Sequence, residues 1–162
     1  MKTILKQIIS FILPIIVLIL VPLYIERNIS IKYILTLSIG LIIMCIGLYI
    51  MTMTISTFIR IGKGTLAPWS PTQKLIIDGM YRYVRNPMII GVMTVLIGES
   101  IAIKSINIFI WVVIFFIINN IFFVLYEEPN LENKFGDEYR EYKKNAPRWI
   151  PRLRPFKPNS LG

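Results

Sequence analysis

The stretch that decides the fold runs from Gly79 to Gly91 and reads GMYRYVRNPMIIG. A basic, aromatic loop passes here directly into an apolar segment. Proline is favoured in the first turn of a helix, because the N–H that it lacks would be unpaired there, so Pro87 predicts a helix start. The free N–H groups and the positive dipole end of this helix, beside Arg85, form a receptor for an anion such as a carboxylate or a phosphate. The alternative is that Arg82 and Arg85 only anchor the helix to lipid headgroups.

The composition predicts an integral membrane protein. Of 162 residues, 55% are hydrophobic, and the mean hydropathy is +0.64, which is more apolar surface than one soluble domain can bury. The formal charge of +9 does not indicate nucleic-acid binding, because the basic residues flank apolar runs instead of forming a polar domain. With Cys45 as the one cysteine and no histidine, we expect neither an internal disulfide nor a metal site. Chemistry must then use carboxylates, Arg, Lys, Tyr, Asn or a bound cofactor.

Four apolar runs predict an all-α fold with about four transmembrane helices in a single membrane-embedded domain. The predicted spans are residues 8–25, 31–59, 88–103 and 106–126. The first contains Pro14 and Pro22, so we expect it to be kinked. The second is longer than the ~30 Å hydrocarbon core requires and must tilt or protrude. The third and fourth are joined by a tight turn at Lys104-Ser105, so they are expected to form an antiparallel hairpin. Gly40 and Gly47, on one face of the second span, predict close packing against another helix.

The remaining segments are polar and gather on one side of the membrane. Residues 60–86 form a long loop of the kind that is often functional. Residues 130–151 carry apolar side chains at helical spacing and predict an interfacial amphipathic helix, and the basic, Pro-rich residues 152–162 predict a flexible tail. Fifteen of the 18 Lys and Arg residues fall on the side of this loop and both termini, which are therefore expected in the cytoplasm. Heavy use of Ile, Lys and Asn favours an AT-rich genome and a bacterial plasma membrane.

Three polar features are expected to meet at this face: the glycines Gly62 and Gly64, the helix start Arg85-Asn86-Pro87, and the pair Glu127-Glu128. Because the third and fourth spans are antiparallel neighbours, Arg85 and Glu127 should lie at the same height and within reach of each other. Such a pair suits a zwitterionic ligand, since arginine binds a carboxylate and glutamate binds an ammonium or ribose hydroxyls. The alternative is an ion pair with only a structural role.

Helical geometry makes the two adjacent glutamates unequal. Asn120 lies seven residues before Glu127 and shares its helix face, which predicts that Glu127 points into a cavity. The residue before a proline avoids the helical region, so we expect a helix break near Glu128, at the edge of the bundle before Pro129. Glu99 lies near the far end of the third span, and we expect it to take no part in chemistry.

Five motifs follow one another along the chain: GKGTLAPW from Gly62, the Gly79–Gly91 stretch, YEEPNL from Tyr126, FGDEY from Phe135 and PRWIP from Pro147. Together they resemble the isoprenylcysteine carboxyl methyltransferase-like and phospholipid methyltransferase superfamily of integral membrane enzymes. The resemblance implies methyl transfer from S-adenosylmethionine to a lipid or lipidated acceptor, either isoprenylcysteine carboxylate-like or phospholipid amine-like. It implies cofactor binding by Gly62, Gly64, Tyr83, Arg85, Asn86, Pro87, Glu127 and Glu128, and catalytic roles for Arg85, Glu127 and Glu128.

Many relatives carry histidine where this chain has Asn86. Asparagine can hydrogen-bond a cofactor, but it does not titrate near neutral pH, so proton transfer at this position is not expected. The sulfonium of S-adenosylmethionine is an activated methyl donor, so a protein has to align donor and acceptor and exclude water. A carboxylate acceptor is already nucleophilic, whereas an ammonium acceptor needs a base, for which Glu127 and Glu128 are the local candidates.

Two alternative functions remain open from the sequence. One is a nicotinamide-dependent membrane reductase of related architecture, and the other is a non-catalytic four-helix membrane scaffold. Titration with S-adenosylmethionine and with NADPH separates the three hypotheses.

Overall fold

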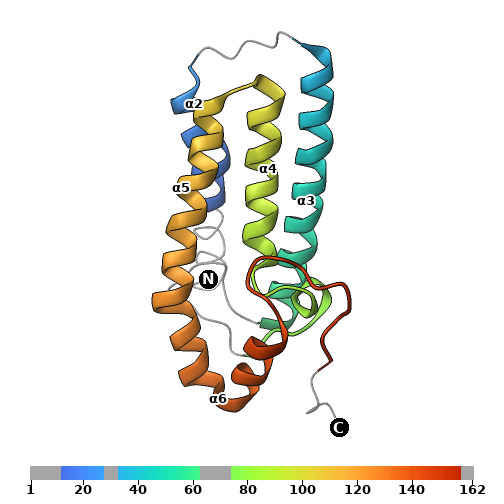
Figure 1. The fold of residues 1–162 in the computed structure, drawn as a ribbon, viewed down its shortest axis with the longest axis vertical. Helices are drawn as coiled ribbons and strands as arrows, with labels where there is room; N and C mark the ends of the chain where they lie inside the picture. The colour runs from blue at the N-terminus through green and yellow to red at the C-terminus, as the bar shows by residue number, and fades with distance from the viewer. Residues whose placement is uncertain (1–11, 28–32, 63–73, 158–162) are drawn as a thin grey trace, which may run out of the picture.

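The computed structural model describes residues 12–27, 33–62 and 74–157, and every regular element in these ranges is helical (Figure 1). This agrees with the predicted all-α class. The elements in chain order are η1 (Ile16–Leu20), α2 (Val21–Ile25), α3 (Ile34–Gly62), η2 (Gly79–Arg82), α4 (Pro87–Ile103), α5 (Ile106–Phe122), η3 (Phe123–Glu127) and α6 (Glu128–Asn145).

Four apolar helical segments run side by side along the molecule, with α4 packed between α3 and α5 (Figure 1). Two of them are long and apolar enough to cross a membrane: Ile34–Ile61, and the helix Ile106–Asn145 in which α5 continues through η3 into α6. Only 17% and 22% of their most apolar windows are buried inside the molecule, so both helices expose apolar side chains along their length. Ile12–Ile25 and α4 are apolar but shorter. Two of the four predicted spans therefore meet the length criterion.

Two pairs of glycines bring α3 and α4 into backbone contact. A Cβ added to Gly40 would lie 2.5 Å from the carbonyl oxygen of Gly98, and one added to Gly47 would lie 2.8 Å from that of Gly91. Both distances are shorter than a van der Waals contact, so no larger residue fits at these positions unless the helices separate. The packing role that the sequence predicts for Gly40 and Gly47 is confirmed.

The hairpin between α4 and α5 forms where the sequence predicts it. Lys104 has a left-handed backbone (φ 55°) that ends α4, and the Ser105 side chain accepts a hydrogen bond from the N–H of Ile108 at the start of α5. At this end of the bundle Ser105 and Asn107 also donate to the Glu26 carboxylate, which joins α5 to the segment after α2. The hairpin places the start of α4 and the end of α5 together at the opposite end.

Two features of the C-terminal region differ from the predicted single amphipathic helix and flexible tail. Gly136 has a positive φ of 54° and divides α6 into two helical pieces that turn back on each other (Figure 1). The apolar face of α6 is covered by protein, since Tyr139 and Tyr142 are buried together with Ala146 and Phe156. Residues 146–157, which we call the C-terminal strap, run beside the loop that precedes α4.

Three backbone hydrogen bonds hold the strap to this loop. The N–H of Arg85 donates to the carbonyl of Pro147 at 2.9 Å, the N–H of Arg152 to Tyr83 at 3.0 Å, and the N–H of Phe156 to Arg82 at 2.8 Å. Residues 152–157 are thus bound to the rest of the protein, and residues 158–162 lie outside the described part of the chain.

Candidate active site

A pocket lies at the end of the bundle where α4 begins and α5 passes into α6. The residues that line it are Phe58, Leu75, Ile76, Tyr81, Arg85, Asn86, Phe123, Glu127, Glu128, Leu131, Tyr139 and Tyr142. Four of the residues that the sequence singles out, Arg85, Asn86, Glu127 and Glu128, are therefore brought together in one place. They come from two segments about forty positions apart in the sequence.

The first turn of α4 leaves polar groups available at the pocket. Pro87 occupies the first helical position, as its missing N–H favours. Asn86 is the N-cap residue, yet its side chain makes no capping hydrogen bond. Asparagine at this position ordinarily accepts a bond from the second or third helical N–H. The Asn86 side chain and the first N–H groups of α4 therefore do not hydrogen-bond to each other.

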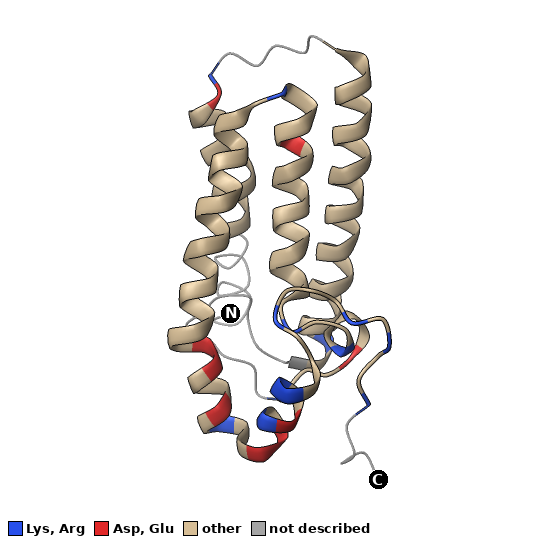
Figure 2. Ribbon diagram, viewed as in Figure 1, with Lys and Arg blue, Asp and Glu red and all other residues tan. Residues whose placement is uncertain are grey.

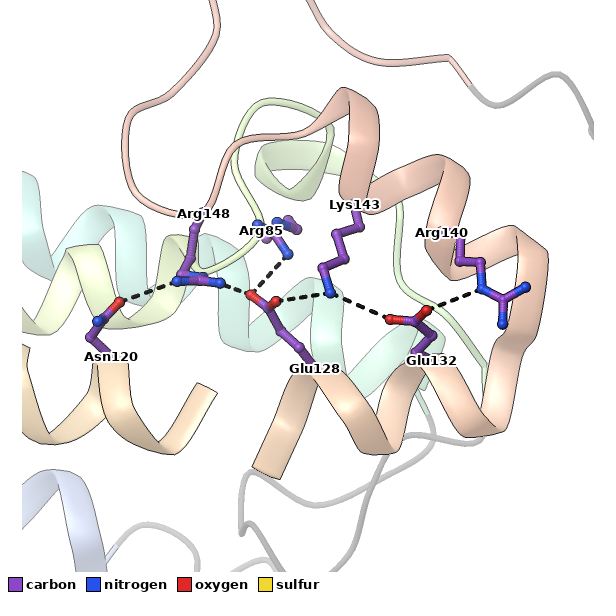
Figure 3. A network of polar contacts seen from close by, with 7 residues as sticks. All are labelled: Arg85, Asn120, Glu128, Glu132, Arg140, Lys143 and Arg148. Atoms are coloured by element: carbon purple, nitrogen blue, oxygen red, sulfur yellow. Dashed lines mark hydrogen bonds and ion pairs between the residues drawn. The ribbon is translucent and has the colours of Figure 1, made fainter. Parts of the chain in front are cut away.

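Glu128 is the centre of a buried ionic network (Figure 3). Its Oε1 accepts hydrogen bonds from Nη1 of Arg85 at 2.9 Å and from Nε of Arg148 at 2.6 Å, and its Oε2 lies 3.4 Å from Nζ of Lys143. The side chains of Arg85 and Glu128 are only 11% and 7% exposed. Lys143 also contacts Glu132, which pairs in turn with Arg140 nearer the surface (Figure 3).

The environment of Glu128 keeps its carboxylate ionised. Burial raises its pKa, but the hydrogen bond from Arg148 and the positive charges of Arg85, Arg148 and Lys143 outweigh burial, so the pKa lies below its usual value. A carboxylate held in this way is a poor base near neutral pH. Three cations around one carboxylate also leave the cluster with excess positive charge beside the pocket.

Glu127 lines the same pocket in a different electrostatic state. Burial, and to a smaller extent the negative charge of Glu128, raise the pKa of Glu127 from 4.5 to about 7. None of the residues that the structure describes donates a hydrogen bond to its carboxyl group. A carboxyl with a pKa near neutrality can accept a proton at physiological pH, which is the property required of a general base.

Tyrosine rings form much of the remaining pocket wall. The hydroxyl of Tyr142 donates to the carbonyl of Tyr81 at 2.7 Å, which fixes α6 against the segment before α4. Burial raises the pKa of Tyr139 to about 12 and raises the pKa of Tyr81 and of Tyr142 as well. All three phenols are therefore neutral at physiological pH. With Phe58 and Phe123 they give the pocket aromatic walls beside the Glu127 carboxyl.

A π-helical turn explains why Glu128, and not Glu127, forms the ion pair with Arg85. The sequence predicts a helix break before Pro129, but the helix continues through η3, a π turn that ends where the N–H of Glu128 bonds the carbonyl of Phe123. A π turn inserts one extra residue and so rotates the following residues by about 100°. Asn120 accordingly shares its face with Glu128, and Arg148 bridges the two side chains. The predicted pairing of Arg85 with Glu127 is thereby corrected.

The C-terminal strap supplies two site residues, Arg148 and Trp149, to which the sequence reasoning assigned no role. Besides bonding Glu128, Arg148 places Nη1 3.4 Å from Oδ1 of Asn120, and Nε1 of Trp149 donates to the same oxygen at 3.0 Å. The Trp149 ring packs on Phe116 and Phe123, with centroids 5.1 and 5.7 Å apart. The sequence feature that could have indicated these two residues is the PRWIP motif, in which an arginine and a tryptophan lie between two prolines.

Not every predicted cofactor residue lies at the pocket. Gly62 is the last residue of α3, and Phe58, one turn earlier, lines the pocket. Gly64 lies outside the described residues. Pro87 is buried at the start of α4 and does not line the pocket, and Tyr83 is 37% exposed on the outside of the loop.

Glu99 is remote from this pocket. It follows Pro87 along α4 by twelve residues, about 18 Å of helix at 1.5 Å per residue. Its Oε2 is buried and has no hydrogen-bond partner among the described residues. A catalytic role for Glu99 remains unexpected.

Comparisons with known proteins identify relatives of this chain. It is 38% identical over 68 residues to an uncharacterised protein of Haemophilus influenzae, which covers 42% of this chain and 98% of that protein. It is 32% identical over 80 residues to the protein-S-isoprenylcysteine O-methyltransferase of Schizosaccharomyces pombe. That match covers 48% of this chain and 33% of the S. pombe protein, so it spans only a third of its length. No solved structure matches the chain.

A family model described as "Phospholipid methyltransferase" matches residues 35–138. The match covers more than half of the chain, including α3, α4 and α5 and the first part of α6. It also contains the four pocket residues from the predicted site, Arg85, Asn86, Glu127 and Glu128. This helical, strongly apolar chain therefore belongs to the phospholipid methyltransferase family of membrane proteins.

Proposed function

We propose that this protein transfers a methyl group from S-adenosylmethionine to a lipid or lipidated acceptor at the cytoplasmic face of a bacterial plasma membrane. The observation that carries the proposal is the convergence of Arg85, Asn86, Glu127 and Glu128 on one aromatic-walled pocket at the end of an apolar helix bundle. Membership of a methyltransferase family supports the reaction class.

The groups at the pocket fit the charges of this cofactor. Nε of Arg85 is buried and has no hydrogen-bond partner among the described residues, and the cluster around Glu128 carries excess positive charge, so a carboxylate is favoured there. The start of α4 adds N–H groups and the uncommitted Asn86 amide. On the other side, aromatic rings and the Glu127 carboxyl favour a cation such as a sulfonium or an ammonium.

Different residues of the pocket bind the ligand, hold other side chains in place and accept a proton. Arg85 and Asn86 bind the anionic and polar parts of the ligand, and Glu128 holds Arg85 in place through a buried ion pair. The bound cofactor supplies an activated methyl group, so the chain contributes alignment and the exclusion of water. Glu127, with a pKa of about 7, accepts the proton that an ammonium acceptor must lose. A carboxylate acceptor needs no such base.

The position of the pocket suits a lipid acceptor. It lies where the apolar helices end and the charged C-terminal region begins (Figure 2). A polar cofactor can enter such a site from water while an acceptor enters from the bilayer. In Figure 2 most of the charged residues of the described part of the chain lie around this end of the bundle. Because Lys and Arg are enriched on the cytoplasmic side of membrane proteins, we propose that this end faces the cytoplasm, with both termini on that side of a four-span chain.

Binding and transfer measurements on the purified protein test the proposal. We expect S-adenosylmethionine and S-adenosylhomocysteine to bind in calorimetric titrations, and NADPH not to bind. Radiolabelled methyl groups should then appear in phosphatidylethanolamine or in a prenylcysteine analogue, tested separately. Binding of NADPH alone would support the membrane reductase, and binding of neither cofactor by folded protein would support the non-catalytic scaffold.

A further inference from the structure

The C-terminal strap carries apolar side chains that the protein leaves uncovered. Ile150 and Leu153 are 79% and 98% exposed, and within the described residues after Tyr126 they are the exposed large hydrophobic side chains. Phe156, three residues later, is buried against Tyr142. Phe156 therefore packs on the protein, whereas Ile150 and Leu153 are exposed on its outside.

Trp149 of the strap packs against the apolar part of α5, which belongs to a helix long and apolar enough to cross a membrane. Trp149 packs on both Phe116 and Phe123 and bonds Asn120 between them. Phe116 precedes Tyr126, where the apolar run ends, by ten residues, or about 15 Å of helix at 1.5 Å per residue. Ile150 follows Trp149 directly. Where α5 crosses a membrane, an exposed isoleucine beside it is surrounded by acyl chains and not by water.

Polar and aromatic residues around these two side chains match a membrane interface. Arg152 and Arg154 alternate with Leu153, and an arginine can extend its charged end to lipid phosphates while its stem stays among apolar groups. The carbonyl of Tyr83 accepts the N–H of Arg152, so this exposed tyrosine stands beside the strap. Tyrosine is enriched where the hydrocarbon region meets the headgroups.

We propose that Tyr83, Ile150, Leu153, Arg152 and Arg154 form a docking surface for anionic phospholipids of the leaflet on the pocket side. Ile150 and Leu153 insert among the acyl chains, and the exposed Arg154 binds a headgroup phosphate. Arg152 donates through Nη1 to the carbonyl of Asn145 at 2.7 Å and adds its positive charge beside the phosphate. The same strap carries Arg148 to Glu128, so lipid bound here steadies the ion network beside the pocket. Tyr83, which the resemblance assigns to the cofactor, belongs instead to this surface.

Depth-resolved fluorescence tests the insertion. An environment-sensitive fluorophore is attached at Leu153→Cys in a Cys45→Ala background, and the protein is placed in nanodiscs of phosphatidylcholine with or without phosphatidylglycerol. We expect blue-shifted emission and strong quenching by lipids with a nitroxide on the acyl chain. Asp137→Cys, at a side chain 96% exposed beside the bend of α6, is the matched control and should be quenched weakly. Equal, weak quenching at both positions overturns the proposal.

A second measurement tests the charge. The ratio of quenching by nitroxide-labelled phosphatidylglycerol to quenching by labelled phosphatidylcholine reports which lipid gathers at residue 153. One arginine near an anionic surface favours it by about fivefold, so Arg154→Gln should lower the ratio by up to that factor. Lys144→Gln, an exposed lysine of α6, is the control. A quenching ratio that Arg154→Gln leaves unchanged contradicts the contact with phosphate. If the Leu153→Cys protein fails to fold, the fluorophore is attached at Ile150→Cys instead. None of these readouts depends on methyl transfer.

Discussion

Arg85 and Glu128 form a buried ion pair of 2.9 Å that joins the residue before the α4 N-cap to the first residue of α6. The two residues are 43 positions apart in sequence. The backbone N–H of Arg85 also bonds the strap, and the carboxylate of Glu128 also bonds Arg148 of the strap. Arg85 and Glu128 therefore link three segments of the chain: the loop before α4, α6 and the strap. The first two of these supply most of the residues that line the pocket.

Glu128→Gln is expected to destabilise the protein more than any other single change in the ionic network. Removing one partner from a buried ion pair costs about 3–5 kcal/mol, because the remaining charges stay buried without compensation. Glu132→Gln is the control, since its pairs with Arg140 and Lys143 lie at the surface, where the loss is much smaller. Thermal unfolding in one detergent compares the two variants. Similar melting temperatures for both would show that the Glu128 network is solvated.

The stability of the folded protein should depend on pH through the ionisation of Glu128. The pKa of folded Glu128 lies below the ordinary value of 4.5, so its stabilising contribution is complete above that value and is lost as pH falls through the folded pKa. As the pH falls below 5, the melting temperature of the native protein should fall more steeply than that of the Glu128→Gln protein. Melting temperatures measured across this range check the expectation, and parallel curves would contradict it.

Asn86→Ala is expected to weaken cofactor binding and to leave folding stability unchanged. Loss of an asparagine N-cap usually costs about 1 kcal/mol, but here the side chain makes no capping bond that could be lost. Titration with S-adenosylhomocysteine measures the affinity, and thermal unfolding measures the stability. Ser105→Ala is the control, because Ser105 does cap α5 through the N–H of Ile108 and should lose stability without losing affinity. Loss of stability in Asn86→Ala would show a structural role.

The helices could be predicted because their signals are local. Pro87 marks the start of α4, the polar Lys104-Ser105 pair marks the hairpin, and uninterrupted apolar runs set the lengths between them. Gly40 and Gly47 predict that α3 packs closely against another helix, since only glycine permits such close backbones, and the structure identifies that helix as α4. The meeting of Arg85 with the glutamates followed from the hairpin alone, which brings the start of one helix to the end of the next.

The partner of Arg85 could not be predicted, because the seven-residue spacing from Asn120 to Glu127 assumes an unbroken α-helix. The π turn η3 adds a residue just before Pro129, and the apolar run that precedes it shows no sequence signal for a π turn. The strap was missed for a different reason. Residues 152–157 show no periodicity, and their order comes from hydrogen bonds to the backbone of Arg82 and Tyr83, which side-chain patterns do not reveal.

Gly40→Ala is expected to push α3 and α4 apart. The added Cβ would meet the carbonyl oxygen of Gly98 at 2.5 Å and the Cβ of Ala102 at 2.6 Å, and backbone on the facing helix cannot move aside alone. Overpacking of this kind costs about 1–3 kcal/mol. Cys45→Ala, at an exposed position of the same helix, is the control. Unfolding temperatures that match in the two variants would contradict backbone contact between the helices.

Arg85→Ala is expected to lower the affinity for S-adenosylhomocysteine by roughly ten- to a hundredfold, because a hydrogen bond to a charged group contributes about 1.5–3 kcal/mol. The change also leaves Glu128 with fewer partners, so affinity must be measured below the unfolding temperature of the variant. Arg82→Ala is the control, since Arg82 forms an ion pair with Asp78 and donates a hydrogen bond to the carbonyl of Ile77, and neither contact is at the pocket. Unchanged affinity in folded Arg85→Ala protein would leave Arg85 with a structural role only.

Glu127 offers the test that separates the two classes of acceptor. Its pKa is raised to about 7, so the carboxyl is mostly protonated below that pH and ionised above it. If the acceptor is an amine, methyl transfer should rise as pH increases through about 7, because only the ionised form accepts the proton. Glu127→Gln should remove this step and slow transfer by roughly 10²–10⁴-fold, the usual contribution of a general base. With a carboxylate acceptor no proton has to leave, so the same variant should keep most of its rate and show no step. Rates measured from pH 5.5 to 8.5 with phosphatidylethanolamine and with a prenylcysteine analogue distinguish these outcomes, with Glu138→Gln, at an exposed position of α6, as the control. A step near pH 7 that persists in Glu127→Gln would assign the titration to another group and exclude Glu127 as the base.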